Sequence, residues 1–529
     1  METTAILFDT RSIQRYIFSS NRLKTNIGAS YLVDRIFVGQ LLTVLKDKLG
    51  EAAFDGDWQK ERTKWSELKN KSLIGYIGGG NALVLLKEGL GEDTARAIVG
   101  EFSRRLLAEC PGLSTGAAIG PMYLSEDGSY LDKNGQKDNS EDNCLRQLVH
   151  KLKEYQNTVF PAVHLPYTGL TVRCPESGEA ANTIFRDNQG KARLCSFDFR
   201  SKLDAYDNAE QALKKRLEDY DAQFGEKFAG FAFPGKLDEL GQQKTENYLA
   251  IVHIDGNNMG KQFDKCLTLS DRRTKSIEVS QKTVASFAGL VADIIAEYDE
   301  YSKNNFLKPR TETGSGKKLL PIRPIVIGGD DVTFVCAAKL ALHYAECFME
   351  KMKEKGIYTC GGIAILGTSY PFFRGYELTE QLCGAAKTCS RPIEGGSCWL
   401  DFGFLHGEQA PTLEEIRAQE YKAQAGNMHF GPYRVDGKET DAHALQNLEK
   451  AIGELSKMPR NKLKELRRII ARGENERKSF LAQLMHQKLS LPKVASWSDY
   501  ETSLWKERKT PYVDAIEMLD YYWLKGGNN

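Results

Sequence analysis

The run from 325 to 335 places Gly-Gly-Asp-Asp, residues 328–331, between two apolar, β-branched segments. β-Branched residues favour strands, and adjacent glycines permit the tight turn of a hairpin. Asp330 and Asp331 would then lie at the hairpin tip, where like charges repel unless a cation is bound. The pattern therefore predicts a divalent-cation site on a β-hairpin.

A third carboxylate, Asp255, follows the apolar run 251–254 and begins a Gly/Asn-rich turn. If these segments share a ferredoxin-like sheet, the strand that ends at Asp255 lies beside the hairpin. Carboxylate and carbonyl oxygens suit Mg²⁺ or Mn²⁺, and two such ions could hold a nucleoside triphosphate for attack by a ribose hydroxyl. Successive strand residues face opposite ways, so Asp330 is preferred over Asp331 as the first ligand.

The elements expected around these residues repeat. The order strand, helix, strand, strand, helix, strand occurs twice, which is the ferredoxin-like pattern. In the first copy the strands are expected at 3–8, 73–77, 82–86 and 114–120, with helices at 12–19, 30–49 and 92–109. In the second copy the strands are expected at 248–254, 322–327, 332–336 and 358–366, with helices at 276–298 and 339–355.

The fold class predicted from this repeat is α+β, with two ferredoxin-like palm domains in tandem. The first domain is expected at 1–164, an insert at 165–245, the second domain at 246–406 and a charged helical domain at 407–529. A chain of 529 residues is too long for one ordinary core, which fits this division.

Composition limits the classes of protein that remain. Hydrophobic content of 41% and charged content of 27% are typical of globular proteins, and the net charge of +1 provides no global attraction to nucleic acid or membrane. No apolar run of transmembrane length was expected, so membrane contact is not predicted. The 11 cysteines form no Cys-x-x-Cys pair, which favours free thiols in a reducing, cytoplasmic compartment.

Four groups of residues resemble the large subunit of type III CRISPR effector complexes, the family of palm-domain cyclic oligoadenylate synthases. The first group joins 6–9, 13–17 and 28–32, and the second is Gly-Gly-Gly-Asn at 78–81. The third joins 255–260 to 328–331, and the fourth joins 362–364, 370–371, 376–378 and 386–387. The resemblance spans residues 6 to 391.

This resemblance implies that the chain converts ATP into cyclic oligoadenylates with release of pyrophosphate, alongside other type III subunits that hold guide and target RNA. It also implies roles for particular residues. Asp255, Asp330 and Asp331 would be the catalytic metal ligands, with the carbonyl of Gly256 as a further ligand. The nucleotide contacts implied are Gly78, Gly79, Gly80, Asn81, Gly256, Asn257, Gly328, Gly329, Lys261 and Lys387.

The chain also departs from the family pattern. No His-Asp dipeptide occurs, so the nuclease domain of many relatives is not expected. Cys174 and Cys195, with His164 nearby, are a poor match for the zinc module of relatives, so zinc is doubtful. Asn257 replaces an acid often present two residues after the first metal aspartate, which would weaken a second metal site.

Alternatives remain at each level. The turn 78–81 lacks a carboxylate and is as readily structural as nucleotide-binding, and Lys387 could be a solvated helix lysine. His253 is expected to pack in the core, and the basic run 457–478 to be a solvated helix face. The chain could also be a free-standing cyclase that uses GTP or mixed nucleotides, or a non-catalytic scaffold that senses nucleotide or RNA.

Overall fold

The computed structural model describes residues 1–140, 142–158, 171–187, 190–220, 224–242, 247–303, 306–406 and 412–524. The chain forms two compact units. The first contains residues 1–220, 258–284 and 326–330, and the second contains 221–257, 285–325 and 331–529. The four-part division expected from the sequence stays a prediction.

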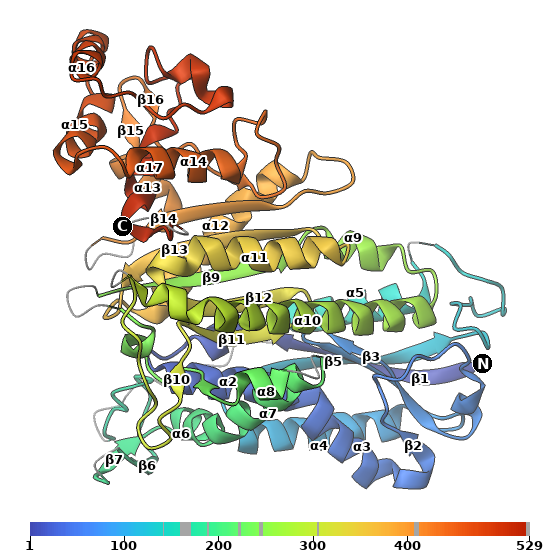
Figure 1. The fold of residues 1–529 in the computed structure, drawn as a ribbon. Helices are drawn as coiled ribbons and strands as arrows, with labels where there is room; N and C mark the ends of the chain where they lie inside the picture. Colours follow the sequence, from blue (N-terminus) through green and yellow to red (C-terminus); the bar gives the residue numbers. More distant parts are fainter. Residues whose placement is uncertain are drawn as a thin grey trace. The chain divides into compact units, whose positions relative to one another are not determined.

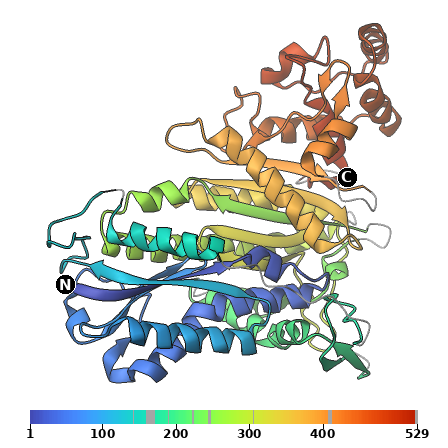
Figure 2. The same cartoon turned by 180° about the vertical axis from the view of Figure 1, so that it is seen from behind.

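The first unit is built on a five-stranded sheet of order β2-β3-β4-β1-β5. Its central strand β1 pairs antiparallel with β4 and β5. Figure 2 shows α5 lying along the strands of this sheet. The strands are β1 (Glu2–Arg11), β2 (Phe54–Asp55), β3 (Ser72–Gly78), β4 (Asn81–Leu85) and β5 (Ser114–Tyr123), and the helices are α1 (Ile13–Ile17), α2 (Leu23–Arg35), α3 (Leu42–Leu49), α4 (Glu92–Glu109) and α5 (Cys144–Thr158).

The second unit is built on a six-stranded sheet of order β11-β12-β9-β13-β14-β17. Its first four strands repeat the connectivity and order of β3-β4-β1-β5 in the first unit, which is the order of a ferredoxin-like sheet. The strands are β9 (Tyr248–Gly256), β11 (Ile322–Gly328), β12 (Asp331–Ala337), β13 (Thr359–Gly367), β14 (Trp399–Phe404) and β17 (Tyr433–Arg434). The mixed α+β class is therefore confirmed.

Helices cover both faces of this second sheet. A Cβ on Gly361 would meet Met349 of α11 (Ala341–Glu354), whereas a Cβ on Gly362 would meet the backbone of Thr379 in α12 (Phe372–Ser390). Because successive strand residues face opposite ways, α11 and α12 lie on opposite faces. Figure 1 shows α10 (Leu269–Tyr301) beside α11 on the same face.

Two parts of the chain contain elements that the sequence did not predict. The insert forms a hairpin of β6 and β7 followed by α6, α7 and α8, and the second sheet is extended by β14 and β17. The helix expected at 30–49 begins earlier, at Leu23, and it contains Gly28, where a Cβ would lie 1.8 Å from the Lys202 carbonyl oxygen. The insert elements are β6 (Thr183–Arg186), β7 (Ala192–Cys195), α6 (Phe197–Asp204), α7 (Tyr206–Glu218) and α8 (Phe224–Phe228).

The C-terminal part is joined to the second sheet by a buried charged network. His429 lies between Asp401 of β14 and Asp514, with Nε2–Oδ1 and Nδ1–Oδ1 separations of 2.9 and 3.1 Å. Asp514 also accepts hydrogen bonds from the backbone of Phe430 and from the Tyr433 hydroxyl. The helices of this part are α13 (Leu413–Glu420), α14 (Leu445–Leu455), α15 (Arg460–Ile470), α16 (Glu474–His486) and α17 (Tyr512–Met518).

Two helical segments, Leu23–Leu49 and Leu269–Tyr301, are long and apolar enough to cross a membrane by length and composition alone. The expectation that no segment reaches this length was wrong. Half of the apolar window in Leu269–Tyr301 is buried inside the protein, and core helices of soluble proteins meet the same criterion. The finding is weak evidence for a membrane span.

Candidate active site

The Gly-Gly-Asp-Asp sequence forms the expected hairpin. β11 ends at Gly328 and β12 begins at Asp331, so Gly329 and Asp330 make the turn. Gly329 has a φ of 56°, a conformation that residues with a Cβ adopt rarely. Glycine is therefore needed here for the backbone itself.

Strand register brings Asp331 to Asp255. β12 runs antiparallel to β9 with Val332 opposite Ile254, so the next pair along the ladder is Asp331 and Asp255. Directly opposed side chains lie about 5 Å apart at Cβ, close enough for two carboxylates to repel. Both side chains are partly exposed at this end of the sheet.

Lys387 of α12 partly neutralises this acidic pair. Its ammonium group donates a hydrogen bond to Oδ2 of Asp255. Burial disfavours the charged ammonium, but the Asp255 carboxylate outweighs burial and raises the pKa of Lys387. The positively charged Lys387 therefore contacts Asp255, the predicted metal ligand, where a bound cation would otherwise lie.

His253 holds the other carboxylate. Its Nδ1 lies 3.2 Å from Oδ1 of Asp331 and 3.1 Å from the Thr333 hydroxyl. The ring packs edge-on against Tyr376 of α12, with centroids 5.6 Å apart. Burial disfavours protonation, but the Asp331 carboxylate overcomes it and raises the pKa of His253. His253 is buried as expected, but it also contacts the site, which its position two residues before Asp255 could have indicated.

Three more residues predicted to contact nucleotide follow Asp255 in the sequence: Gly256, Asn257 and Lys261. Asn257 is buried, and its amide donates to the Ser390 hydroxyl and to the Ser397 carbonyl, 3.0 and 2.8 Å away. These contacts join the end of β9 to the end of α12, so the amide nitrogen of Asn257 has a structural role. Gly256 ends β9, and Lys261 is exposed on α9 (Met259–Asp264). Their nucleotide contacts stay predictions.

The side-chain oxygen atoms at this site are of the kind that Mg²⁺ and Mn²⁺ prefer. Asp255 and Asp331 supply hard oxygen atoms on neighbouring strands, and the ammonium of Lys387 already occupies a cation position beside them. Among the residues that the structure describes, no group of three or more His, Cys, Asp or Glu is gathered closely enough to hold a metal. Asp255 and Asp331 could supply two carboxylate ligands to a cation, and the metal itself stays a prediction.

The first unit carries a related arrangement around its own hairpin. Asn81 lies opposite Asp9 in the β1–β4 register, and Gln156 of α5 donates to Oδ2 of Asp9 at 2.7 Å. Gly79 and Gly80 have φ values of 58° and 77°, so the turn needs glycine for conformational reasons. The sequence analysis did not select Asp9 as a site residue, although it ends the first predicted strand as Asp255 ends the later one.

Gly78 in this hairpin has a packing role. A Cβ there would lie 2.3 Å from the Ser276 hydroxyl, which donates to the Ile77 carbonyl. Arg273, one turn earlier in α10, donates to the carbonyls of Ile74 and Gly75. These contacts account for Gly78 structurally, while its contact with nucleotide stays a prediction.

The candidate zinc residues lie in the insert. Cys174 and Cys195 share a small buried cluster with Phe185 and Phe199. The hydroxyl oxygens of Ser177 and Ser196 lie 2.8 Å apart. His164 lies outside the described residues.

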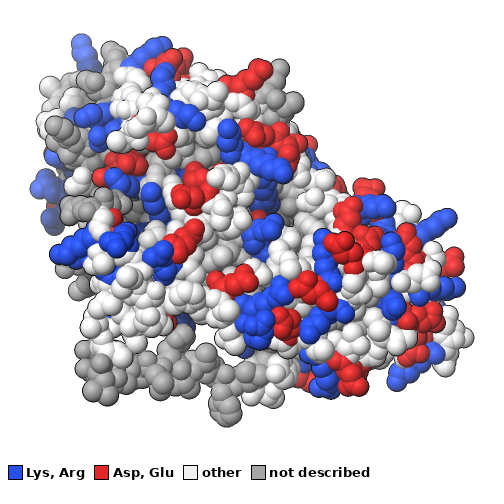
Figure 3. Space-filling view, turned by 90° about the horizontal axis from the view of Figure 1, so that it is seen from below, with Lys and Arg blue, Asp and Glu red and all other residues white. Residues whose placement is uncertain are grey.

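The basic run 457–478 is largely compensated by acidic neighbours. It spans α15 and the start of α16, with a break near Gly473. Its ion pairs are Lys457–Glu454, Arg460–Asp520, Lys462–Glu465, Arg467–Glu517 and Lys478–Glu474. On the face seen in Figure 3, basic and acidic side chains are likewise interspersed. A broad positive surface for RNA is not evident on that face.

Comparison with known proteins shows what the segment that carries this site is similar to. Residues 248–392 match the Cas10/Cmr2 second palm domain. No curated protein sequence matches the chain. Among solved structures, a Csm1–Csm4 cassette in complex with pppApApA matches with a TM-score of 0.52 and 13% identity, covering 98% of this chain and 69% of that chain.

A Csm1–Csm4 cassette in complex with AMPPNP matches with a TM-score of 0.50 and 13% identity, covering 98% of this chain and 70% of that chain. At this identity the likeness concerns the fold. The segment 248–392 is thus similar to the second palm domain of Cas10/Cmr2. The expected resemblance of the chain to the Cas10-type large subunit of type III CRISPR complexes is confirmed.

Proposed function

We propose that the chain is a nucleotidyltransferase that converts ATP into cyclic oligoadenylates and releases pyrophosphate in type III CRISPR defence. The observation that carries the proposal is the pair Asp255 and Asp331, opposed on two strands of a Cas10/Cmr2-type palm domain. The bound pppApApA and AMPPNP named for the matched cassettes support adenine nucleotides as the substrate class.

The chemistry follows from the charges at the site. A bound Mg²⁺ or Mn²⁺ would stabilise the developing negative charge on the triphosphate and lower the pKa of the attacking ribose hydroxyl. Each condensation forms one phosphodiester bond at the α-phosphorus and breaks the bond to pyrophosphate. A final intramolecular attack on the terminal triphosphate closes the ring.

The chain's own residues divide the remaining work. Asp255 and Asp331 would hold the cation, and His253 keeps the Asp331 side chain in place through its 3.2 Å contact. Lys387 would leave Asp255 when the cation binds and turn its ammonium to the triphosphate. This exchange keeps a positive charge beside the acidic pair in both states.

The first sheet would act as the other palm domain, and it would bind a nucleotide without metal. The order of its strands β3-β4-β1-β5 repeats that of β11-β12-β9-β13, and Asn81 stands where the second sheet has Asp331. One carboxylate, Asp9, remains there. Other type III subunits with guide and target RNA, and a cytoplasmic location, belong to the same proposal.

The test is incubation of the purified chain with each of the four nucleoside triphosphates and Mg²⁺ or Mn²⁺, with and without a type III complex holding target RNA. Mass spectrometry identifies the products. Cyclic oligoadenylates should form from ATP, and Asp255→Asn and Asp331→Asn should abolish them. Asp299→Asn, at an exposed aspartate paired with Lys318, is the matched control.

Other results would favour a different function or refute the proposed site. Products from GTP or mixed nucleotides would favour a different cyclase, and product formation that persists in Asp331→Asn would refute the site. No product even with target RNA bound, together with copurified RNA and small subunits, would favour the non-catalytic scaffold.

A further inference from the structure

The basic run 457–478 contains one row of cations on an exposed helix face. Lys464 and Arg468 are exposed and lie four residues apart in α15, so they share one side of the helix. Arg472 is also exposed and follows at the same interval, in a final turn where its N–H donates to the Ile469 carbonyl. We call these three residues the basic row. The other side of α15 is buried through Leu463, Leu466 and Ile470.

Acidic side chains near the basic row are engaged with other groups. Glu476 accepts a hydrogen bond from the Gly473 N–H at the start of α16, 3.0 Å away. The other acidic residues form ion pairs with cations outside the row, namely Lys457–Glu454, Arg460–Asp520, Lys462–Glu465, Arg467–Glu517 and Lys478–Glu474. Among the residues that the structure describes, none of these ion pairs includes a member of the basic row. The row is therefore a local concentration of positive charge in a chain whose net charge is +1.

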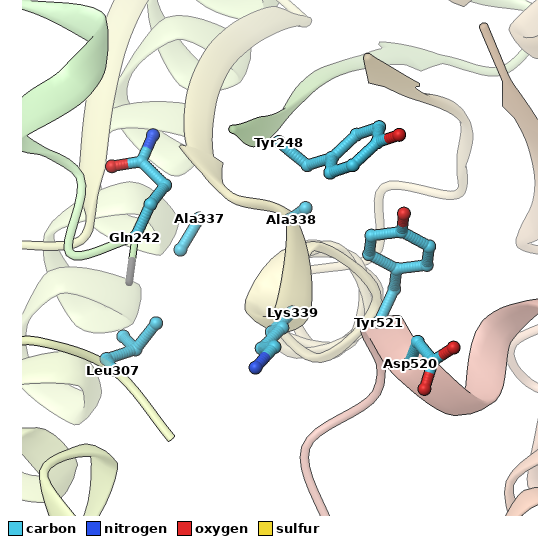
Figure 4. A pocket seen from close by; sticks show the side chains of 8 residues that line it. All are labelled: Gln242, Tyr248, Leu307, Ala337, Ala338, Lys339, Asp520 and Tyr521. Carbon is cyan, nitrogen blue, oxygen red and sulfur yellow. The ribbon is translucent and has the colours of Figure 1, made fainter. Parts of the chain in front are cut away.

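Contacts at both ends of α15 hold the backbone of the basic row in place. At the first end, Arg460 pairs with Asp520, which lines the cavity of about 160 Å³ seen in Figure 4. At the other end, the indole N–H of Trp505 donates to the carbonyl of the last residue of α15, 3.0 Å away. Arg477 of α16 donates to the Arg472 carbonyl. A partner would therefore meet a preformed row, which lowers the entropic cost of binding.

The neighbouring helix α16 does not cover the basic row. Its buried residues are Phe480 and Leu484, and Lys462 of α15 lies over the Phe480 ring at 5.9 Å. Figure 1 shows the two helices next to each other. Lys462 and Lys464 point to opposite sides of α15, because two residues turn a helix by about 200°. Packing of α16 on the Lys462 side thus leaves the basic row accessible.

The length and charge of the basic row fit the backbone of a nucleic acid. Its three charges span about 12 Å, since eight residues rise about 1.5 Å each. A nucleic-acid strand in a duplex has one phosphate about every 3.4 Å of axis, so the row can face about three phosphates. Two of its members are arginines, whose planar guanidinium groups can bind two phosphate oxygens each. Acidic protein surfaces usually intersperse both signs of charge, whereas a phosphate backbone is an unbroken row of one sign.

We propose that the basic row of α15 binds the phosphate backbone of an RNA strand without reading its sequence. Contacts to phosphate fix the position of a nucleic acid but carry no sequence information. Binding of a phosphate backbone follows from the charges of the row alone. The choice of RNA over DNA rests on the proposed function, because a type III complex would hold guide and target RNA.

The test is fluorescence anisotropy of a labelled single-stranded RNA of about 20 nucleotides with the full chain in EDTA, between about 0.05 and 0.2 M salt. The logarithm of the affinity should fall linearly with the logarithm of the salt concentration, by about 0.7 for each phosphate contact. Lys464→Gln with Arg468→Gln should therefore reduce this slope by about 1.4 and lower the affinity at least tenfold. Arg472→Gln alone should reduce the slope by about 0.7.

A matched double variant separates unpaired from paired cations. Lys457→Gln with Lys478→Gln also removes two exposed charges from the same run, but each of these lysines pairs with a glutamate. This control should leave the slope unchanged. Glutamine has nearly the helix propensity of lysine and arginine, and thermal unfolding checks that each variant is folded.

Single-stranded DNA of the same sequence and a polyglutamate peptide of the same length are the comparison ligands. RNA should bind at least as tightly as DNA and more tightly than polyglutamate. Tighter binding of DNA would overturn the choice of RNA, and tighter binding of polyglutamate would indicate an acidic protein as the partner. An unchanged slope in Lys464→Gln with Arg468→Gln, or an equal loss in the control, would overturn the proposal. No turnover is measured, so these results are independent of whether the chain makes cyclic oligoadenylates.

Discussion

Asp9 and Asp255 lie near the C-terminal ends of β1 and β9, equivalent strands of two sheets that share the order of four strands. Each carboxylate accepts a hydrogen bond from the helix that follows β5 or its counterpart β13: Gln156 of α5 donates to Asp9, and Lys387 of α12 donates to Asp255. The two arrangements differ in charge. A neutral amide holds the acid that faces Asn81, and an ammonium holds the acid that faces Asp331.

This difference predicts unequal effects of removing each acid. Asp255→Asn should lower the rate of pyrophosphate release from ATP at least 100-fold, because it removes half of the acidic pair that would hold the cation. Asp9→Asn should change the rate less than about tenfold, since an asparagine oxygen can still accept from Gln156. A steady-state pyrophosphate assay at saturating ATP and Mn²⁺ measures both. Equal losses would show that the first sheet also carries catalytic charge.

Lys387 competes with a metal for Asp255. Replacing it by methionine should therefore tighten Mn²⁺ binding in the absence of nucleotide by about three- to tenfold, equivalent to about 1 kcal/mol. The same variant should raise the KM for ATP, because the ammonium no longer meets the triphosphate. Calorimetric titration with Mn²⁺ measures the first effect, and Lys261→Met on exposed α9 is the control. Weaker Mn²⁺ binding in Lys387→Met would contradict this competition.

The Asp401–His429–Asp514 network predicts a loss of stability at alkaline pH. Burial disfavours the charged ring, but the two carboxylates outweigh it and raise the pKa of His429 to about 9. Its contribution is complete below the unfolded pKa of 6.5 and is lost as pH rises towards about 9. The free energy of unfolding should fall by about 3 kcal/mol over that range from this group.

Urea unfolding at a series of pH values measures this dependence. His429→Gln should flatten it between pH 6.5 and 9, while lowering stability by about 3–5 kcal/mol at neutral pH because two buried carboxylates lose their cation. A pH dependence unchanged in the variant would assign the effect to other groups.

Two glycines near α12 predict opposite effects of the same substitution. A Cβ on Gly362 would lie 2.2 Å from the backbone oxygen of Thr379, so Gly362→Ala must separate β13 from α12 and should cost about 2–3 kcal/mol. Gly384, inside α12, faces open space, and Gly384→Ala should add up to about 1 kcal/mol through helix propensity. Chemical denaturation compares the two variants. Similar stabilities would contradict the close packing of strand and helix.

The sequence predicted those features that depend on local pattern. Apolar β-branched runs located both hairpins, and register in a ferredoxin-like sheet predicted that Asp255 meets the Gly-Gly-Asp-Asp hairpin. β14 was missed because Asp401 and Gly403 interrupt its apolar pattern, and only the distant His429 and Arg417 make Asp401 acceptable in a core. The helix expected at 30–49 begins earlier and includes Gly28, which packs closely on Lys202, a contact that spacing along the chain does not reveal.

The candidate site was predictable to a similar degree. The acidic residues follow from strand ends and turn chemistry, both of which are local. The contacts of His253 with Asp331 and of Gln156 with Asp9 depend on tertiary position, which spacing along the chain does not reveal. Asn257 also has a tertiary contact that its place after Asp255 did not indicate: its amide donates to Ser390 at the end of α12 and to the Ser397 carbonyl, while its nucleotide contact stays a prediction.

If the proposed cation binds at Asp255, the ion pair with Lys387 would make metal loading an ion-exchange reaction. An empty carboxylate pair is electrostatically unstable, whereas this protein supplies its own replaceable counter-ion from α12. The acidic pair thus keeps its geometry without metal, and displacement of the lysine supplies a charge for the incoming nucleotide at the moment the cation arrives. Metal and nucleotide binding should consequently be cooperative, with the coupling located in a single side chain.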